Sequence, residues 1–134
     1  MVSQENIKRA KEIAQTIVDA YGKDPAEYDA VEQQALSAFT FGTVYTYYFE
    51  EANATIPEFQ AVMMKIFFDQ FHYDLKELAN YFDFLAHCTQ EEYHPMMYTI
   101  IHKGIDGTDY LDEPGALGEN LHKLIAILKG EIGP

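Results

Sequence analysis

The apolar run ALSAFTFGTVY, residues 35–45, sets the architecture expected of this chain. It contains a stripe in which every third or fourth residue is apolar or small, as at Phe39 and Gly42, and this spacing is typical of one face of a helix. Large residues also occupy the other faces, as at Leu36 and Phe41, which indicates a helix surrounded by neighbours. We therefore expect a central helix in which Gly42 permits a close crossing with another helix.

The stripe extends on both sides of this run. Asp24 and Pro25 supply an N-cap followed by a proline at a first helical position, and the apolar period then continues from Tyr28 to Phe49. The sequence therefore predicts one long helix over 25–49.

Helical periods cover most of the remaining chain. Thr55 and Glu58 have the spacing of a capping box, and glycines and prolines supply the other boundaries. We expect helices at about 4–21, 25–49, 57–72, 74–88, 92–103 and 117–129, with a continuous helix over 57–88 as the alternative to a break at 72–74. The predicted fold class is all-α, a single domain over residues 1–134 with about six helices packed around the long second one.

Residues 104–115, GIDGTDYLDEPG, stand between the fifth and sixth predicted helices. They contain three glycines, one proline, four acids and no base, a composition that predicts an ordered or partly ordered loop. A loop of this length in a compact domain usually has a function. The alternative is an acidic solubility loop in which Tyr110 and Leu111 are merely tucked into the core.

Composition narrows the possible functions. The 134 residues carry a net charge of −13, which excludes a sequence-independent nucleic-acid binder, and 48% hydrophobic residues exclude a disordered chain. The sequence contains no apolar window of the length that a membrane span needs. Cys88 is the single cysteine, so no internal disulfide can form. We expect a cytoplasmic protein that does not bind membranes.

Two Glu-x-x-His motifs, Glu91 to His94 and Glu119 to His122, match the spacing of ligands in di-iron helical bundles. The first motif precedes Pro95 at a helix start, and we favour surface histidines in an acidic field over a metal site. No pattern of a nucleophile, a phosphate-binding loop or an EF-hand is present. The sequence predicts no enzyme, no metal and no cofactor, with a metal-binding bundle or bundle enzyme as the alternative.

A partner-binding surface is the favoured interpretation of the acidic residues. Four acids of residues 104–115 would form a negative edge, Tyr110 would supply a desolvated anchor, and a second acidic group joins them if the fifth helix returns alongside. The predicted binding residues are Asp106, Asp109, Tyr110, Asp112 and Glu113, with Glu91, Glu92 and Tyr93 nearby.

The segments AFTFG (38–42) and HKGIDG (102–107) are similar to segments of helical immunity families, and the whole acidic, all-α chain resembles the immunity proteins that neutralise bacterial toxins. Such proteins are paired with colicin nucleases or contact-dependent inhibition toxins. The resemblance implies tight binding of a basic toxin domain, often a nuclease, whose active site or substrate surface becomes occluded. It implies no catalytic residues.

A self-associating adaptor is a further alternative. Lys8, Arg9 and Lys11 give the first helix a basic strip, whose charge complements the acidic remainder of the chain. We expect a monomer or a weak homodimer.

Overall fold

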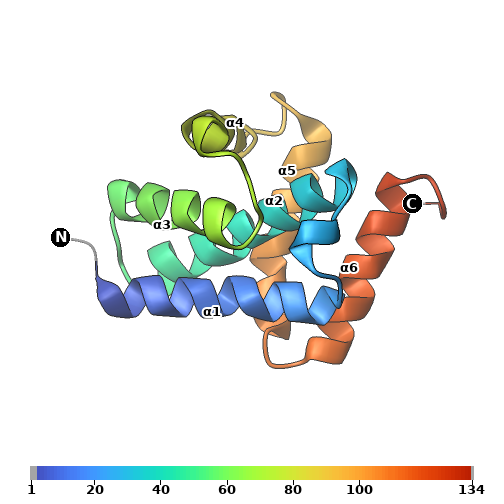
Figure 1. The fold of residues 1–134 in the computed structure, drawn as a ribbon, viewed down its shortest axis with the longest axis horizontal. Coiled ribbons are helices and arrows are strands. Elements are labelled where there is room, and N and C mark those ends of the chain that lie inside the picture. The colour runs from blue at the N-terminus through green and yellow to red at the C-terminus, as the bar shows by residue number, and fades with distance from the viewer. Residues whose placement is uncertain (1–2, 134) are drawn as a thin grey trace.

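The computed structural model describes residues 3–133, and these fold into six α-helices with no strand among them (Figure 1). The α-helices are α1 (Gln4–Tyr21), α2 (Ala30–Thr46), α3 (Ile56–Asp69), α4 (Leu78–His87), α5 (Pro95–Asp106) and α6 (Pro114–Leu128). Short 3-10 or π turns lie between them: η1 (Pro25–Glu27), η2 (Tyr47–Glu51), η3 (Leu75–Glu77) and η4 (Gly107–Tyr110). The all-α prediction is confirmed.

Helix α2 lies at the centre, as predicted, and packs against α1, α3, α5 and α6. Every residue from Ala35 to Val44 is buried, so this helix has no polar face in its middle turns. In Figure 1, α1 crosses one side of α2 and α5 crosses the other.

The crossing of α2 and α5 depends on two glycines. A Cβ atom at Gly42 would lie 2.1 Å from the carbonyl oxygen of Ile101, and one at Gly104 would lie 2.0 Å from that of Phe39. The hydroxyl of Thr43 donates a hydrogen bond to the Gly104 carbonyl oxygen across this contact, at 2.7 Å. The close crossing predicted at Gly42 is therefore present, and Gly104 is its counterpart on α5.

The predicted start of the second helix was wrong. Asp24 caps only the 3-10 turn η1, and α2 begins five residues later behind Asp29. Asp29 and Glu32 form a complete capping box, in which each side chain accepts a hydrogen bond from the other residue's backbone N–H. This box satisfies two free amides at once, whereas Asp24 satisfies one, so the later start is the more stable one.

The predicted break between the third and fourth helices is present, although α3 ends at Asp69, before the predicted 72, and α4 begins at Leu78, after the predicted 74. Thr55 and Glu58 form the expected capping box at the start of α3. The chain then turns after α3 with His72 at a positive φ of 59°, and Asp74 caps η3 before α4 begins. Helices α3 and α4 are therefore separate.

The predicted loop over residues 104–115 was also wrong in its extent. Helix α5 starts at Pro95 behind the N-cap His94, not at 92, and continues to Asp106. The turn η4 follows directly, and α6 starts at Pro114. Gly104 and Gly107 lie against the Phe39 backbone and ring, respectively, so they serve close packing here and do not end the helix.

Among residues 3–133, no helix combines the length and the apolarity that are needed to cross a membrane.

Candidate partner-binding surface

The structure places the predicted binding residues in two groups at opposite ends of α5. Asp106, Asp109, Tyr110, Asp112 and Glu113 surround its C-terminal end, and we call this group the acidic corner. The other three residues, Glu91, Glu92 and Tyr93, precede its N-terminal end (Figure 1). A helix of 12 residues is about 18 Å long, so the two groups do not form one continuous patch.

All five residues of the acidic corner are exposed. The backbone that carries them is helical from Pro95 through Tyr110 and is followed by a turn of three residues before α6. Gly107 holds this backbone against the core, because a Cβ there would lie 2.5 Å from the Phe39 ring. The corner therefore presents its four carboxylates from a backbone that is fixed by packing.

Two acids of the corner, Asp106 and Glu113, lie at opposite ends of helix dipoles. Asp106 is the last residue of α5, where the negative end of the helix dipole makes a carboxylate unfavourable. Glu113 is the N-cap of α6, where the positive end of that dipole favours a carboxylate. The position of Glu113 is thus explained by folding, whereas that of Asp106 is not.

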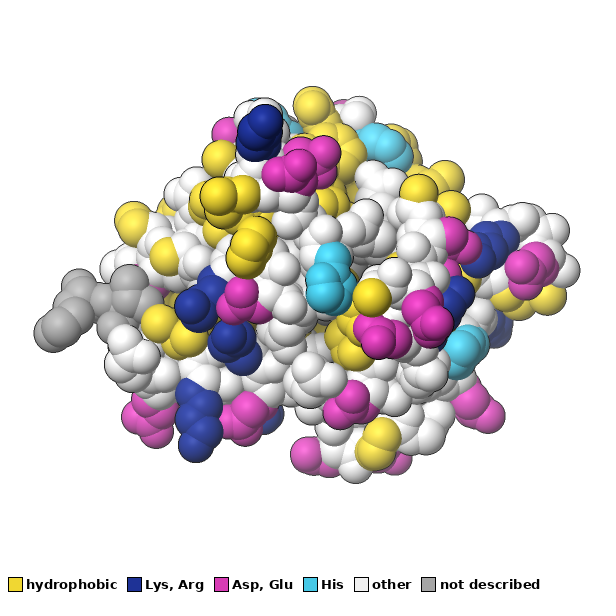
Figure 2. Space-filling model, in the orientation of Figure 1, with side chains coloured by type: hydrophobic (Ala, Val, Ile, Leu, Met, Phe, Trp, Pro, Cys, Tyr) yellow, Lys and Arg dark blue, Asp and Glu magenta, His cyan; other side chains and the backbone are white. Residues whose placement is uncertain are grey.

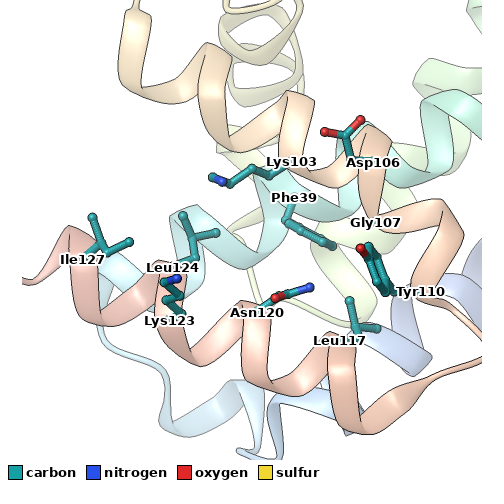
Figure 3. Close-up of a pocket in the computed structure, with 10 residues that line it drawn as sticks. All are labelled: Phe39, Lys103, Asp106, Gly107, Tyr110, Leu117, Asn120, Lys123, Leu124 and Ile127. Atoms are coloured by element: carbon teal, nitrogen blue, oxygen red, sulfur yellow. The ribbon is translucent and has the colours of Figure 1, made fainter. Parts of the chain in front are cut away.

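A pocket of about 240 Å³ lies beside the corner, between α5 and α6 (Figure 3). Tyr110, which is 39% exposed, forms one wall, and Phe39 and Leu117 form an apolar floor. Lys103 and Lys123 also line this pocket. Neither lysine was predicted as a site residue, because no local pattern shows that residues twenty apart on two helices face the same space.

The second group lies in the turn between α4 and α5. Glu91, Glu92 and Tyr93 are all exposed, and the Tyr93 side chain keeps 55% of its surface accessible. Its ring centroid lies 5.3 Å from that of His87 and 6.3 Å from that of Phe84, both on α4. Tyr93 therefore rests on the outside of α4.

The two Glu-x-x-His motifs do not converge. Among residues 3–133, no three His, Cys, Asp or Glu side chains form a group that could hold a metal ion. His94 accepts the backbone N–H of Met97 as the N-cap of α5, and the His122 ring nitrogen Nε2 lies 2.7 Å from the carbonyl oxygen of Tyr21. Both histidine rings thus form a hydrogen bond with the backbone, His94 within its own helix start and His122 with the end of α1.

A buried carboxylate that the sequence analysis did not single out joins α1 to α2. Glu32 is 2% exposed and accepts hydrogen bonds from the Tyr21 hydroxyl and, at 2.8 Å, from Lys23 Nζ. Burial alone would raise the pKa of Glu32, but the hydrogen bonds from Lys23 and Tyr21 outweigh it, so the pKa lies below its usual value. This acid serves folding and is not available to a partner.

Comparison with known protein families gives a match that covers most of the chain. The sequence pattern of a protein family described as immunity protein 48 matches residues 4–129. No curated protein and no solved structure matches the chain.

Proposed function

This chain belongs to the immunity protein 48 family, and we propose that it neutralises a cognate toxin by binding a basic domain of that toxin through the acidic corner. The observation that carries this proposal is the placement of Asp106 as the last residue of α5, where a carboxylate opposes the helix dipole. Acids in a position that folding does not favour are good candidates for a role in recognition.

Charge supports a basic partner. A toxin that holds RNA or DNA presents Lys and Arg to the phosphates, and a chain of net charge −13 attracts such a surface at long range. We therefore propose that the toxin is a nuclease and that the immunity protein occludes the surface that binds nucleic acid. Occluding that surface requires only that the immunity protein is bound to the toxin, and it requires no chemical reaction.

Tyr110 provides the apolar contact that the proposal needs. Its ring is partly exposed at the rim of the pocket, so a partner side chain placed against it loses water on both sides. Aromatic residues with this setting supply most of the energy of protein interfaces, while rim charges mainly set the association rate.

The acidic corner would form only part of the interface. A stable interface buries about 800 Å² on each partner, more than five side chains provide. We propose that Glu91, Glu92 and Tyr93 form a second contact when the partner extends along α5, and that the protein binds as a monomer.

The test uses the cognate toxin domain and the triple variant Asp106→Asn, Asp109→Asn and Asp112→Asn. Asparagine keeps the shape of each side chain and removes its charge, so the association rate should fall and become less dependent on salt. The dissociation rate should change little. Stopped-flow or surface-based kinetics at two salt concentrations measures both rates.

The comparison is the double variant Glu91→Gln and Glu92→Gln, which removes two charges, one fewer than the triple variant, from the other end of α5. A smaller effect on the association rate per charge removed is expected, because these acids belong to the second contact. If the triple variant associates as fast as the parent at low salt, the acidic corner is not the binding surface.

A further inference from the structure

The pocket between α5 and α6 brings two lysines together on an acidic chain, apart from the Lys and Arg side chains that gather over α1 (Figure 2). Its floor is apolar, since Phe39, Leu117 and Leu124 are each at most 6% exposed. Its rim includes Lys103 and Lys123, two of only nine basic residues in the chain. A concave apolar site with a few charged groups at its edge is the usual form of a specific binding site.

The two lysines are available for a ligand. The ion pairs found between residues 3 and 133 engage Lys11, Lys23 and Lys129, and none of them includes Lys103 or Lys123. Asp106 is the one acid in the pocket lining. In Figure 3 the Lys103 side chain extends away from Asp106, toward the end of the pocket where Lys123 lies.

The pocket is therefore polarised along its length. Lys103 and Lys123 make one end positive, and Asp106 and Tyr110 lie toward the other end (Figure 3). An arginine or lysine from a partner would be attracted by the acidic corner outside but repelled by the two ammonium groups at the positive end. A carboxylate would be attracted there, in a site that is partly shielded from water and so strengthens the attraction.

We propose that this pocket binds a carboxylate carried on an apolar stem, presented by an acidic side chain of the partner protein. The identity of the occupant rests on the proposed function. The acidic corner would then bind a positive group of the toxin and the pocket a negative one. A partner would need both groups at the correct distance from each other. A surface with both positive and negative sites discriminates between partners better than a surface with one kind of charge, because an incorrectly placed partner brings like charges together.

The chemistry of the pocket is tested first with a small probe and the free protein. Three probes share a phenylpropyl stem: 3-phenylpropionate, its neutral amide 3-phenylpropanamide, and the cation 3-phenylpropylamine. Each is titrated into ¹⁵N-labelled protein, and the amide shifts of residues 103–127 are followed. We expect saturable shifts at residues 103, 107, 120, 123 and 124 with the carboxylate and about tenfold weaker binding of the amide and the amine.

Two double variants that each remove two positive charges test whether Lys103 and Lys123 are responsible for binding the carboxylate. Lys103→Gln with Lys123→Gln should weaken 3-phenylpropionate about tenfold, to the level of the amide. Lys65→Gln with Lys76→Gln, at exposed sites on α3 and η3, should leave the affinity unchanged. All four lysines are exposed, so both variants should fold. If carboxylate, amide and amine bind equally, or if the two variants behave alike, the proposal is wrong.

A competition experiment tests whether the partner protein occupies the pocket. Adding the cognate toxin domain to the protein loaded with 3-phenylpropionate should release the probe, which is seen as narrowing of the probe's own NMR signals. A toxin that binds while the probe stays bound would overturn the partner as occupant and leave the proposed function intact. A toxin that does not bind at all would instead overturn the proposed function, whatever the probe does.

Discussion

The two ends of α5 offer similar chemistry in different settings. Each end presents a tyrosine and exposed acids, yet the C-terminal end is a helical corner packed on Phe39 through Gly104 and Gly107, while the N-terminal end is a turn that lies on the outside of α4. A side chain on a fixed backbone loses less entropy when a partner binds. Amino-acid composition therefore identifies candidate contact residues, but packing determines which of them are already positioned for binding.

Removing the ring beneath the acidic corner should have the largest effect. Phe39 is 4% exposed, and Phe39→Ala should lower the free energy of unfolding by about 3–5 kcal/mol, since it deletes a buried aromatic ring. Hydrogen exchange of the native variant should accelerate at residues 104–113 more than at 89–93. An equal acceleration at both ends would mean that the ring does not fix the corner specifically.

Adding a methyl group at the crossing of α2 and α5 should have the second-largest effect on stability. Gly104→Ala would place its Cβ 2.0 Å from a backbone oxygen that cannot move independently of α2, so a loss of about 3 kcal/mol is expected, at the upper end for overpacking. Urea denaturation measures it. The control is Gly115→Ala in the first turn of α6, where the added Cβ meets nothing within 4 Å and alanine should be neutral or stabilising. Equal stabilities for the two variants would contradict the close crossing.

The two tyrosines compare the ends in binding. Tyr110→Ala should raise the dissociation rate of the cognate toxin by an amount that corresponds to about 2 kcal/mol, because it removes an anchor at a pocket rim. Tyr93→Ala should have a smaller effect, since that ring remains 55% exposed on the side of α4. Kinetic measurements on both variants check this. A larger effect from Tyr93 would place the main anchor at the N-terminal end.

The smallest expected effect separates two acids within the corner itself. Asp106→Asn should stabilise the fold by about 0.3–1 kcal/mol, and Glu113→Gln should destabilise it by a similar amount, because the two side chains lie at opposite ends of helix dipoles. Thermal unfolding at low ionic strength gives both values. Two changes of the same sign would show that the dipoles do not control these positions.

Sequence reasoning identified the features that depend on one helix at a time. The burial of α2 around Phe39, the close approach at Gly42 and the Thr55 capping box are all encoded in local spacing, and the structure contains each of them. Family membership agrees with the resemblance to immunity proteins that the acidic, all-α character of the whole chain suggested.

The errors arose where two local signals compete or where distant elements meet. Asp24 and Asp29 are both acceptable caps, and only the reciprocal bonds of Glu32 decide for the later one. Gly104 was interpreted as a helix end, although its lack of a side chain is needed for contact with α2. The pairing of Lys103 with Lys123 depends on how α5 packs against α6, which no single stretch of sequence encodes.

The crossing of α2 and α5 also has a consequence for the evolution of the family. Gly42 and Gly104 each leave room for the backbone of the other helix, so enlarging either one moves α5 outward and removes the need for the other. We therefore expect the two glycines to be kept or lost together in related chains. In descendants that lose one glycine, drift at the second position should follow, and the corner that α5 carries would shift with it, so a new toxin specificity could begin with a substitution in the core.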